Sequence, residues 1–286
     1  MDGIKFYAFA DEASPNIDEQ IAALKRNGLQ GLEIRNVDGV NVSDITLEKA
    51  KEVKQKLSSN GLVTWSIGSP IGKINIENDD FSAHTEKLKH TLEIANILEA
   101  ENIRMFSFYM PEGKEISDFK NEVIERLGIM CDIASKSGVA LCHENEKGIY
   151  GDIPERCLEL FKALPCLKGI FDPANFVQSG VDTIKAWDML KNYIYYMHIK
   201  DAKSGGAIVP AGKGDGNIKE IAQKFISLGG NAFTMEPHLT VFDGLANLER
   251  KGEKSEIAEG EYSDSNIAFD TACNAFKNLL YRKEVL

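Results

Sequence analysis

The 286-residue sequence predicts an α/β protein, a single (β/α)8 TIM barrel that spans residues 1–286. Three observations support this prediction. Eight short runs of apolar or β-branched residues recur along the chain, amphipathic segments separate them, and acidic or imidazole side chains follow several of the runs. Strands that alternate with helices are typical of a parallel sheet, and eight of them close into a barrel of about 250 residues.

The predicted strands are the apolar runs at residues 4–9, 31–34, 62–67, 103–108, 139–144, 167–171, 193–200 and 232–236. Apolar residues three or four positions apart predict helices at residues 16–27, 46–60, 82–98, 120–137, 217–228 and 265–281. Turn and cap residues mark several boundaries, such as Ser14-Pro15 before the first helix and Asn27-Gly28 after it.

A long loop is predicted at about residues 239–264, between the last strand and the final helix, because this stretch is rich in Gly, Glu, Lys and Asp. In a barrel, the loop after a strand lies on the face that carries the active site, so it is either a lid over the substrate or an excursion on the surface.

Composition narrows the classes of partner. A formal net charge of −11 disfavours binding to nucleic acid or to anionic membrane surfaces. The sequence has neither a basic leader followed by an apolar stretch nor a run of about 20 apolar residues that would span a membrane. The five cysteines have no paired spacing, as is usual for reduced thiols. We therefore expect a cytoplasmic protein that acts on a small molecule, with a homo-oligomer as one open alternative.

Four side chains at the ends of consecutive predicted strands point to a metal site: Glu144, Asp172, His198 and Glu236. Each alone could form a salt bridge, and Asp172 before Pro173 could cap a helix. Three carboxylates buried together would repel one another unless they shared a cation. A set of three carboxylates and one imidazole suits Mn²⁺ best, with Mg²⁺, Co²⁺ or Zn²⁺ as alternatives.

Further candidates surround this set. The residues expected to contact substrate are Arg35, Glu146, Asn175, Lys200 and His238. The two cations would bind a carboxylate or phosphate of the substrate, or would pair with surface acids. His143 should point toward the helices and be structural. The glycine-rich run at residues 212–216 lacks the spacing of a nucleotide-binding loop and is expected to shape the mouth of the barrel.

The sequence resembles the xylose isomerase-like barrels of the sugar phosphate isomerase/epimerase superfamily, which includes ketose 3-epimerases, hydroxypyruvate isomerases, inosose dehydratases and endonuclease IV. The resemblance rests on the Glu144 strand and on residues 171–175 (FDPAN), 198–201 (HIKD), 212–216 (GKGDG) and 235–238 (MEPH). It implies that all four candidates bind the metal. It also implies that Glu144 and Glu236 act as acid and base on opposite faces of the substrate.

The chain departs from that pattern at two positions. Asn175 stands where several ketose epimerases carry a histidine, and Tyr150 stands where they carry a further acid. An amide can bind a sugar hydroxyl but cannot carry a proton near neutral pH. These differences weaken a free-sugar 3-epimerase assignment. Endonuclease IV needs more histidines than the five present here.

The predicted function is a divalent-metal-dependent isomerase or epimerase that acts through a metal-stabilised enediolate on a keto-sugar, a sugar derivative or a sugar phosphate. One alternative is a lyase or dehydratase acting on an inosose or an oxidised glycoside, because the same intermediate can expel a β-substituent. A second is a non-catalytic sugar-binding barrel, which the paired glutamates disfavour.

Overall fold

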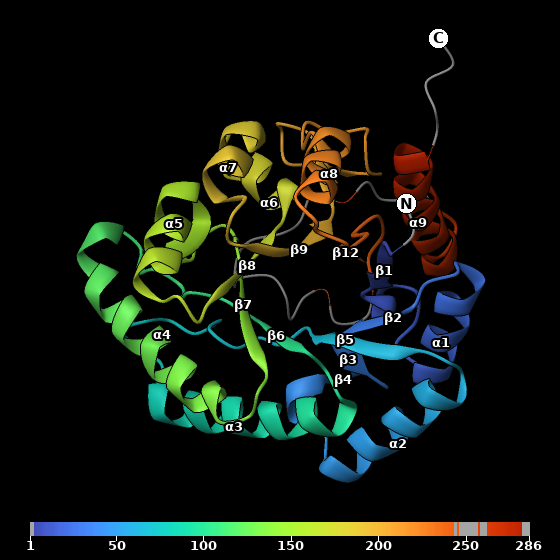
Figure 1. Cartoon of the computed structure of the whole chain (residues 1–286), viewed down its shortest axis with the longest axis horizontal. Helices are drawn as coiled ribbons and strands as arrows, with labels where there is room; N and C mark the ends of the chain where they lie inside the picture. Colours follow the sequence, from blue (N-terminus) through green and yellow to red (C-terminus); the bar gives the residue numbers. More distant parts are fainter. Residues whose placement is uncertain (1–2, 243–244, 246–256, 258–261, 282–286) are drawn as a thin grey trace.

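Eight parallel strands close into a barrel in the computed structural model, which describes residues 3–242, 245, 257 and 262–281 (Figure 1). Around the barrel they follow in chain order: β1 (Lys5–Ala8), β2 (Gly31–Ile34), β5 (Val63–Ile67), β6 (Asn102–Met105), β7 (Ala140–Glu144), β8 (Lys168–Phe171), β9 (Ile194–Ile199) and β12 (Ala232–Met235). Pairing of β1 with both β2 and β12 closes the barrel. The predicted fold class is confirmed.

Helices surround the strands on the outside (Figure 1). They are α1 (Ile17–Arg26), α2 (Leu47–Ser59), α3 (Phe81–Leu98), α4 (Lys120–Ser135), α5 (Pro154–Ala163), α6 (Pro173–Gln178), α7 (Thr183–Leu190), α8 (Ile218–Ser227) and α9 (Ser265–Tyr281). Short hairpins, β3 (Asn36–Val37) with β4 (Val40–Asn41) and β10 (Asp201–Ala202) with β11 (Ile208–Val209), lie in the connections.

Polar side chains begin several helices by accepting hydrogen bonds from backbone N–H groups of the first turn. Asn16 accepts from two such groups at the start of α1, so the cap follows Ser14-Pro15 by one residue. Thr46 caps α2 and Asp80 caps α3 in the same way. These local signals explain why the helix boundaries could be predicted to within a few residues.

The strands separate two environments by their alternation. Residues on the outer face, such as Leu32, Ile103 and Phe233, belong to the large apolar core shared with the helices. Inside the barrel, the amino-terminal half is filled by an aromatic and aliphatic cluster that includes Tyr7, Trp65 and other residues. The carboxyl-terminal half of the interior carries polar side chains, and this is where the site lies.

The predicted strand at residues 103–108 is too long. The β6 strand ends at Met105, because the Phe106 amide donates to the carbonyl of Ile71 in another loop, and Phe108 adopts a positive φ of 65°. Most of the predicted long loop at residues 239–264 lies outside the described residues. Within its described part, Leu239 and Phe242 are buried.

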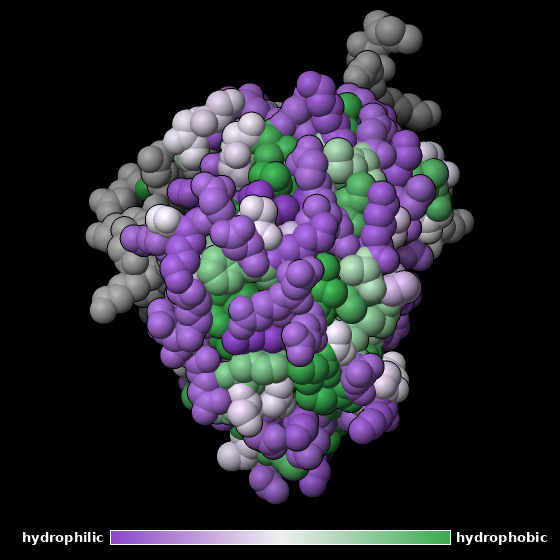
Figure 2. Space-filling model, turned by 90° about the vertical axis from the view of Figure 1, so that its left-hand side faces the viewer, coloured by the Kyte–Doolittle hydropathy of each residue, from purple (hydrophilic) through white to green (hydrophobic). Residues whose placement is uncertain are grey.

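The side of the barrel formed by α4 and α5 is mainly hydrophilic, with smaller hydrophobic areas between the polar side chains (Figure 2). This distribution fits helices that bury one face against the strands. Among the described helices, none is long and apolar enough to cross a membrane.

Candidate metal centre

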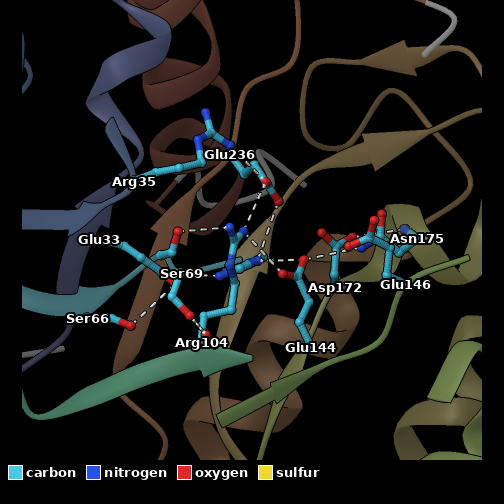
Figure 3. Close-up of polar contacts among 12 residues, drawn as sticks. Glu33, Arg35, Ser66, Ser69, Arg104, Glu144, Glu146, Asp172, Asn175 and Glu236 are labelled. Carbon is cyan, nitrogen blue, oxygen red and sulfur yellow. Dashed lines mark hydrogen bonds and ion pairs between the residues drawn. The ribbon is translucent and has the colours of Figure 1, made fainter. Parts of the chain in front are cut away.

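The four predicted metal ligands meet at the carboxyl-terminal end of the barrel interior. Glu144 is the last residue of β7, and His198 lies within β9. Asp172 and Glu236 directly follow β8 and β12. One potential ligand atom from each lies within 4.8 Å of the others, and each residue is at most 3% exposed. In Figure 3, the three carboxylates reach toward one another beside Arg104. The sequence therefore predicted this convergence, and the metal-binding role remains a prediction.

His198 lies between the carboxylates. Its Nδ1 atom is 3.0 Å from Glu144 Oε1 and 3.4 Å from Glu236 Oε2. The two carboxylate oxygens of Asp172 have different contacts. Oδ1 accepts a hydrogen bond from the backbone N–H of Asn175 at 2.9 Å and so caps α6. Oδ2 accepts no hydrogen bond, but it forms an ion pair with the Lys200 ammonium 3.0 Å away. The sequence alternative of a helix cap is thus correct for one oxygen and leaves the other for a ligand.

Three buried cations neutralise the carboxylates. Arg104 Nη1 lies 3.3 Å from Glu144 Oε2 and 3.8 Å from Glu236 Oε1. Lys200 Nζ also lies 3.1 Å from Glu236 Oε2, and Arg35 Nη1 lies 3.4 Å from Glu236 Oε1. Arg35 and Lys200, predicted to contact substrate, therefore already pair with acids of the protein.

These contacts set the ionisation of the site. Burial by itself would raise the pKa of Glu144, but His198 and Arg104 lower it to about 2. The pKa of Glu236 is likewise well below its usual value, because Lys200 and His198 outweigh burial. Burial raises the pKa of Asp172 to about 7, against the influence of Lys200. Both glutamates are therefore held ionised, as a cation ligand or a proton acceptor must be.

The other predicted substrate contacts surround the four ligands. Asn175 Nδ2 donates to Glu144 Oε1 at 3.2 Å. Glu146 accepts from Lys73 Nζ at 2.8 Å, a cation that the sequence prediction did not include. Tyr150 is directed away, since its hydroxyl donates to Glu159 Oε2 at 2.6 Å.

His238 belongs to a neighbouring network with Glu12. Its backbone amide donates to Glu12 Oε2 at 2.6 Å, and its Nδ1 lies 3.3 Å from Glu12 Oε1. Glu12, Glu236 and His238 come within range of a shared ion. However, Arg35 Nη2 already lies 3.1 Å from Glu12 Oε1, so a guanidinium supplies the positive charge there.

The glycine-rich run at residues 212–216 is organised by a carboxylate of the protein. The Asp201 side chain accepts the backbone N–H groups of Gly212, Gly214 and Gly216 at 2.8 to 3.0 Å. A side chain at Gly214 would collide with Asp201, which explains the need for glycine there. Because Asp201 takes these donors, the loop cannot offer them to a phosphate.

Sequence reasoning missed two charged residues inside the barrel, Glu33 on β2 and Arg104 on β6, both at most 3% exposed. A signal was present. Each is a lone charged residue within a run otherwise predicted to be a buried strand, where such a side chain must find a partner. His143, by contrast, is where it was expected, because it lies beside Phe161 of α5 and hydrogen-bonds Ser107 at 2.9 Å.

A family model described as "Xylose isomerase-like TIM barrel" matches residues 21–252. A 3-dehydroshikimate dehydratase of Bacillus anthracis is 21% identical over 181 residues, which cover 62% of this chain and 64% of the dehydratase. The matched region thus spans less than two thirds of that relative's length.

Solved structures share the fold. The probable 3-DHS dehydratase AsbF of Bacillus anthracis aligns with a TM-score of 0.72 and 19% identity over 98% of this chain and 100% of its own. The 3-keto-D-glucoside 4-epimerase YcjR of E. coli aligns with a TM-score of 0.70 and 13% identity, over 96% of this chain and 99% of its own. The IOLI protein with a binding zinc atom aligns with a TM-score of 0.73 and 14% identity, over 99% of this chain and 100% of its own.

Proposed function

Because the chain belongs to the xylose isomerase-like TIM barrel family, we propose that it is a divalent-metal-dependent isomerase or epimerase of a keto-sugar, a sugar derivative or a sugar phosphate. The observation that carries the proposal is the meeting of Glu144, Asp172, His198 and Glu236 in one buried group of potential ligands. Their convergence is an observation of this chain's own geometry, which supports the proposal beside family membership.

The donors fit a divalent ion. Three of the four are carboxylates, which favour Mn²⁺ or Mg²⁺, and the single imidazole also allows Zn²⁺, the ion held by the IOLI relative. The Oδ2 atom of Asp172 is buried and faces the Lys200 ammonium at 3.0 Å, so in this structure a positive charge already lies where an ion would bind this oxygen. We propose Mn²⁺ as the first choice.

A divalent ion held by these residues would polarise a ketone and the adjoining hydroxyl of a substrate and so favour the enediolate. Glu144 and Glu236 flank Nδ1 of His198 and are both ionised, so either can take the proton from the carbon next to the carbonyl. Return by the other glutamate to the opposite face would invert the centre. Return to the neighbouring carbon would move the carbonyl.

Two other side chains of the site have matching roles. Arg104 is fixed beside both glutamates, and its pKa is raised by Glu144 and Glu236 against the effect of burial, so it remains a cation. It would stabilise negative charge that develops on a substrate oxygen. Asn175 faces Glu144 through its amide nitrogen, and we assign it to binding a substrate hydroxyl.

A dehydratase is the second candidate, and two similarities favour it: a 3-dehydroshikimate dehydratase is similar in sequence, and a probable 3-DHS dehydratase is similar in structure. The first step would be the same removal of a proton beside a ketone. The pathways separate afterwards, when a β-hydroxyl leaves as water in place of proton return.

Deuterium exchange tests the proposal. The Mn²⁺-loaded protein is incubated in D₂O with keto-sugars, their phosphates and keto-cyclitols, and deuterium is expected at the carbon beside the carbonyl. A product lighter by one water identifies a dehydratase. Tight binding of a sugar without any exchange would contradict both candidates and favour a non-catalytic barrel.

The Glu236→Gln variant should lose exchange by about 10²-fold to 10⁴-fold, the usual contribution of a general base. Its control is Glu220→Gln, which removes an exposed glutamate of α8 and should exchange normally. Exchange at the normal rate in Glu236→Gln would exclude this residue as the proton carrier.

A further inference from the structure

Glu33 is a buried carboxylate to which the proposed reaction gives no task. It lies on β2 inside the barrel and is 0% exposed. Its Oε2 atom is 3.0 Å from His198 Nε2, whereas Glu144 contacts the other ring nitrogen, Nδ1. We infer that Glu33 is a positioning residue, which accepts the Nε2 hydrogen of His198 and thereby holds Nδ1 toward the metal ion of the proposed site. This inference rests on the proposed function.

The two ring nitrogens of His198 have different surroundings. Nδ1 faces the potential metal ligands, at 3.0 Å from Glu144 Oε1 and 3.4 Å from Glu236 Oε2. Nε2 faces only Glu33 among these acids. With a carboxylate 3.0 Å from each nitrogen, the metal-free imidazole carries a hydrogen on both. An ion bound at Nδ1 would replace the hydrogen there, while Nε2 would continue to donate to Glu33. The nitrogen that binds the ion is therefore chosen by a residue that does not touch the ion.

Glu33 is itself held in place by its second oxygen. Its Oε1 atom accepts the Tyr196 hydroxyl at 2.8 Å and lies 3.4 Å from the Ser66 hydroxyl. With Oε1 engaged, Oε2 is fixed toward His198. The carboxylate is thus oriented by two strands, β5 and β9, while it is carried by a third.

Aromatic packing restricts the plane of the imidazole but does not select a nitrogen. The Phe9 and Tyr196 rings lie edge-on to it, with centroids 5.2 Å and 5.5 Å away. A half-turn of the ring within this space would exchange nitrogen for carbon on both sides. That turn would break the hydrogen bonds of the ring to Glu33 and Glu144 and its ion pair with Glu236. Glu33 is the acid among these three that contacts Nε2, so it helps to select the nitrogen that faces the site.

A purely structural role is the competing explanation, because Glu33 also raises the pKa of Arg104 and so helps to balance that buried cation. The two roles predict different results. Charge balance alone would affect folding stability and leave the coordination of a bound ion unchanged. Positioning of His198 would alter the affinity and the ligand geometry of that ion.

The test is metal binding to Glu33→Gln, a variant that keeps the shape of the side chain and removes its charge. Mn²⁺ affinity is measured by calorimetry, and Co²⁺ is used to read the coordination from its visible spectrum. We expect affinity to fall by about 10-fold to 100-fold, the usual effect of losing the partner of a metal-binding histidine, with an altered cobalt spectrum. Thr64→Val is the control, since it changes a buried polar side chain of β5 whose hydroxyl forms no hydrogen bond to Glu33 or His198.

Thermal unfolding in EDTA establishes that each variant is folded before metal is added. Equal affinity and an identical cobalt spectrum in wild type and Glu33→Gln would overturn the inference. So would an equal loss in Thr64→Val, because it would indicate a general loosening of the interior. If the wild-type protein binds neither ion, the proposed metal centre fails first and the inference fails with it.

Discussion

Replacing Lys200 with methionine should destabilise the protein in EDTA and make its stability more dependent on metal. The ammonium lies 3.0 Å from Asp172 Oδ2 and 3.1 Å from Glu236 Oε2, and the three side chains are at most 8% exposed. Methionine keeps much of the length and apolar contact of the lysine stem. The perturbation is therefore mainly the loss of one buried positive charge between two carboxylates.

The magnitude follows from that burial. Removing one partner of a buried ion pair costs about 3–5 kcal/mol, because the remaining charges lose their compensation. For a chain of this size, 1 kcal/mol shifts the melting temperature by about 2–4 °C. We therefore expect a fall of roughly 10 °C in EDTA. An ion that binds the same carboxylates returns about 4 kcal/mol when present at about 1,000 times its dissociation constant.

The assay is thermal unfolding in EDTA and in saturating Mn²⁺, for wild type and variant. The metal-induced rise in melting temperature should be larger for Lys200→Met, since the ion no longer displaces an ammonium from the carboxylates. Lys191→Met is the control. Lys191 forms an exposed ion pair with Asp188, so its loss should change stability by less than about 1 kcal/mol.

Two results would refute the reasoning. If Lys200→Met is as stable as wild type in EDTA, the ammonium does not stabilise the carboxylates. If Mn²⁺ raises the melting temperature of both proteins equally, the ion does not use the oxygens that Lys200 contacts.

Two further predictions concern groups beside the site. Burial raises the pKa of Glu12 from 4.5 to about 8. Between these pH values the carboxyl is deprotonated in the unfolded chain but protonated in the folded protein, so the free energy of unfolding in EDTA should fall as pH rises. Glu12→Gln lacks this titration, so its stability relative to wild type should increase from pH 5 to pH 8 in urea unfolding; a constant difference would contradict the assignment. Asp201→Ala should lose roughly 3 kcal/mol or more and speed trypsin cleavage after Lys213, because three N–H groups of that loop lose their acceptor. Asp215→Ala, in the same loop but exposed, should be cleaved more slowly than Asp201→Ala, and equal rates would argue against Asp201 as the organiser.

Local sequence features were sufficient to predict the barrel and the four ligand candidates. Each strand is recognisable from its own run of apolar residues, and the position after a strand end places a side chain at the barrel mouth whatever the rest of the chain does. Glu144, Asp172, His198 and Glu236 could therefore be selected one at a time. The end of β6 could not, because the amide of Phe106 pairs with Ile71 in a loop 35 residues earlier, a contact with no local signal.

The partners of the site were decided by the tertiary structure alone. Glu33 and His198 are 165 residues apart in the chain and meet only because the barrel is closed and its strands have one register. The same closure places Arg104 between Glu144 and Glu236. It also brings Lys200 into an ion pair with Asp172. The sequence by itself determined which residues face the interior, since alternation is a property of each strand. Which of them touch depends on the tilt and stagger of all eight strands together, and packing of the whole chain fixes these.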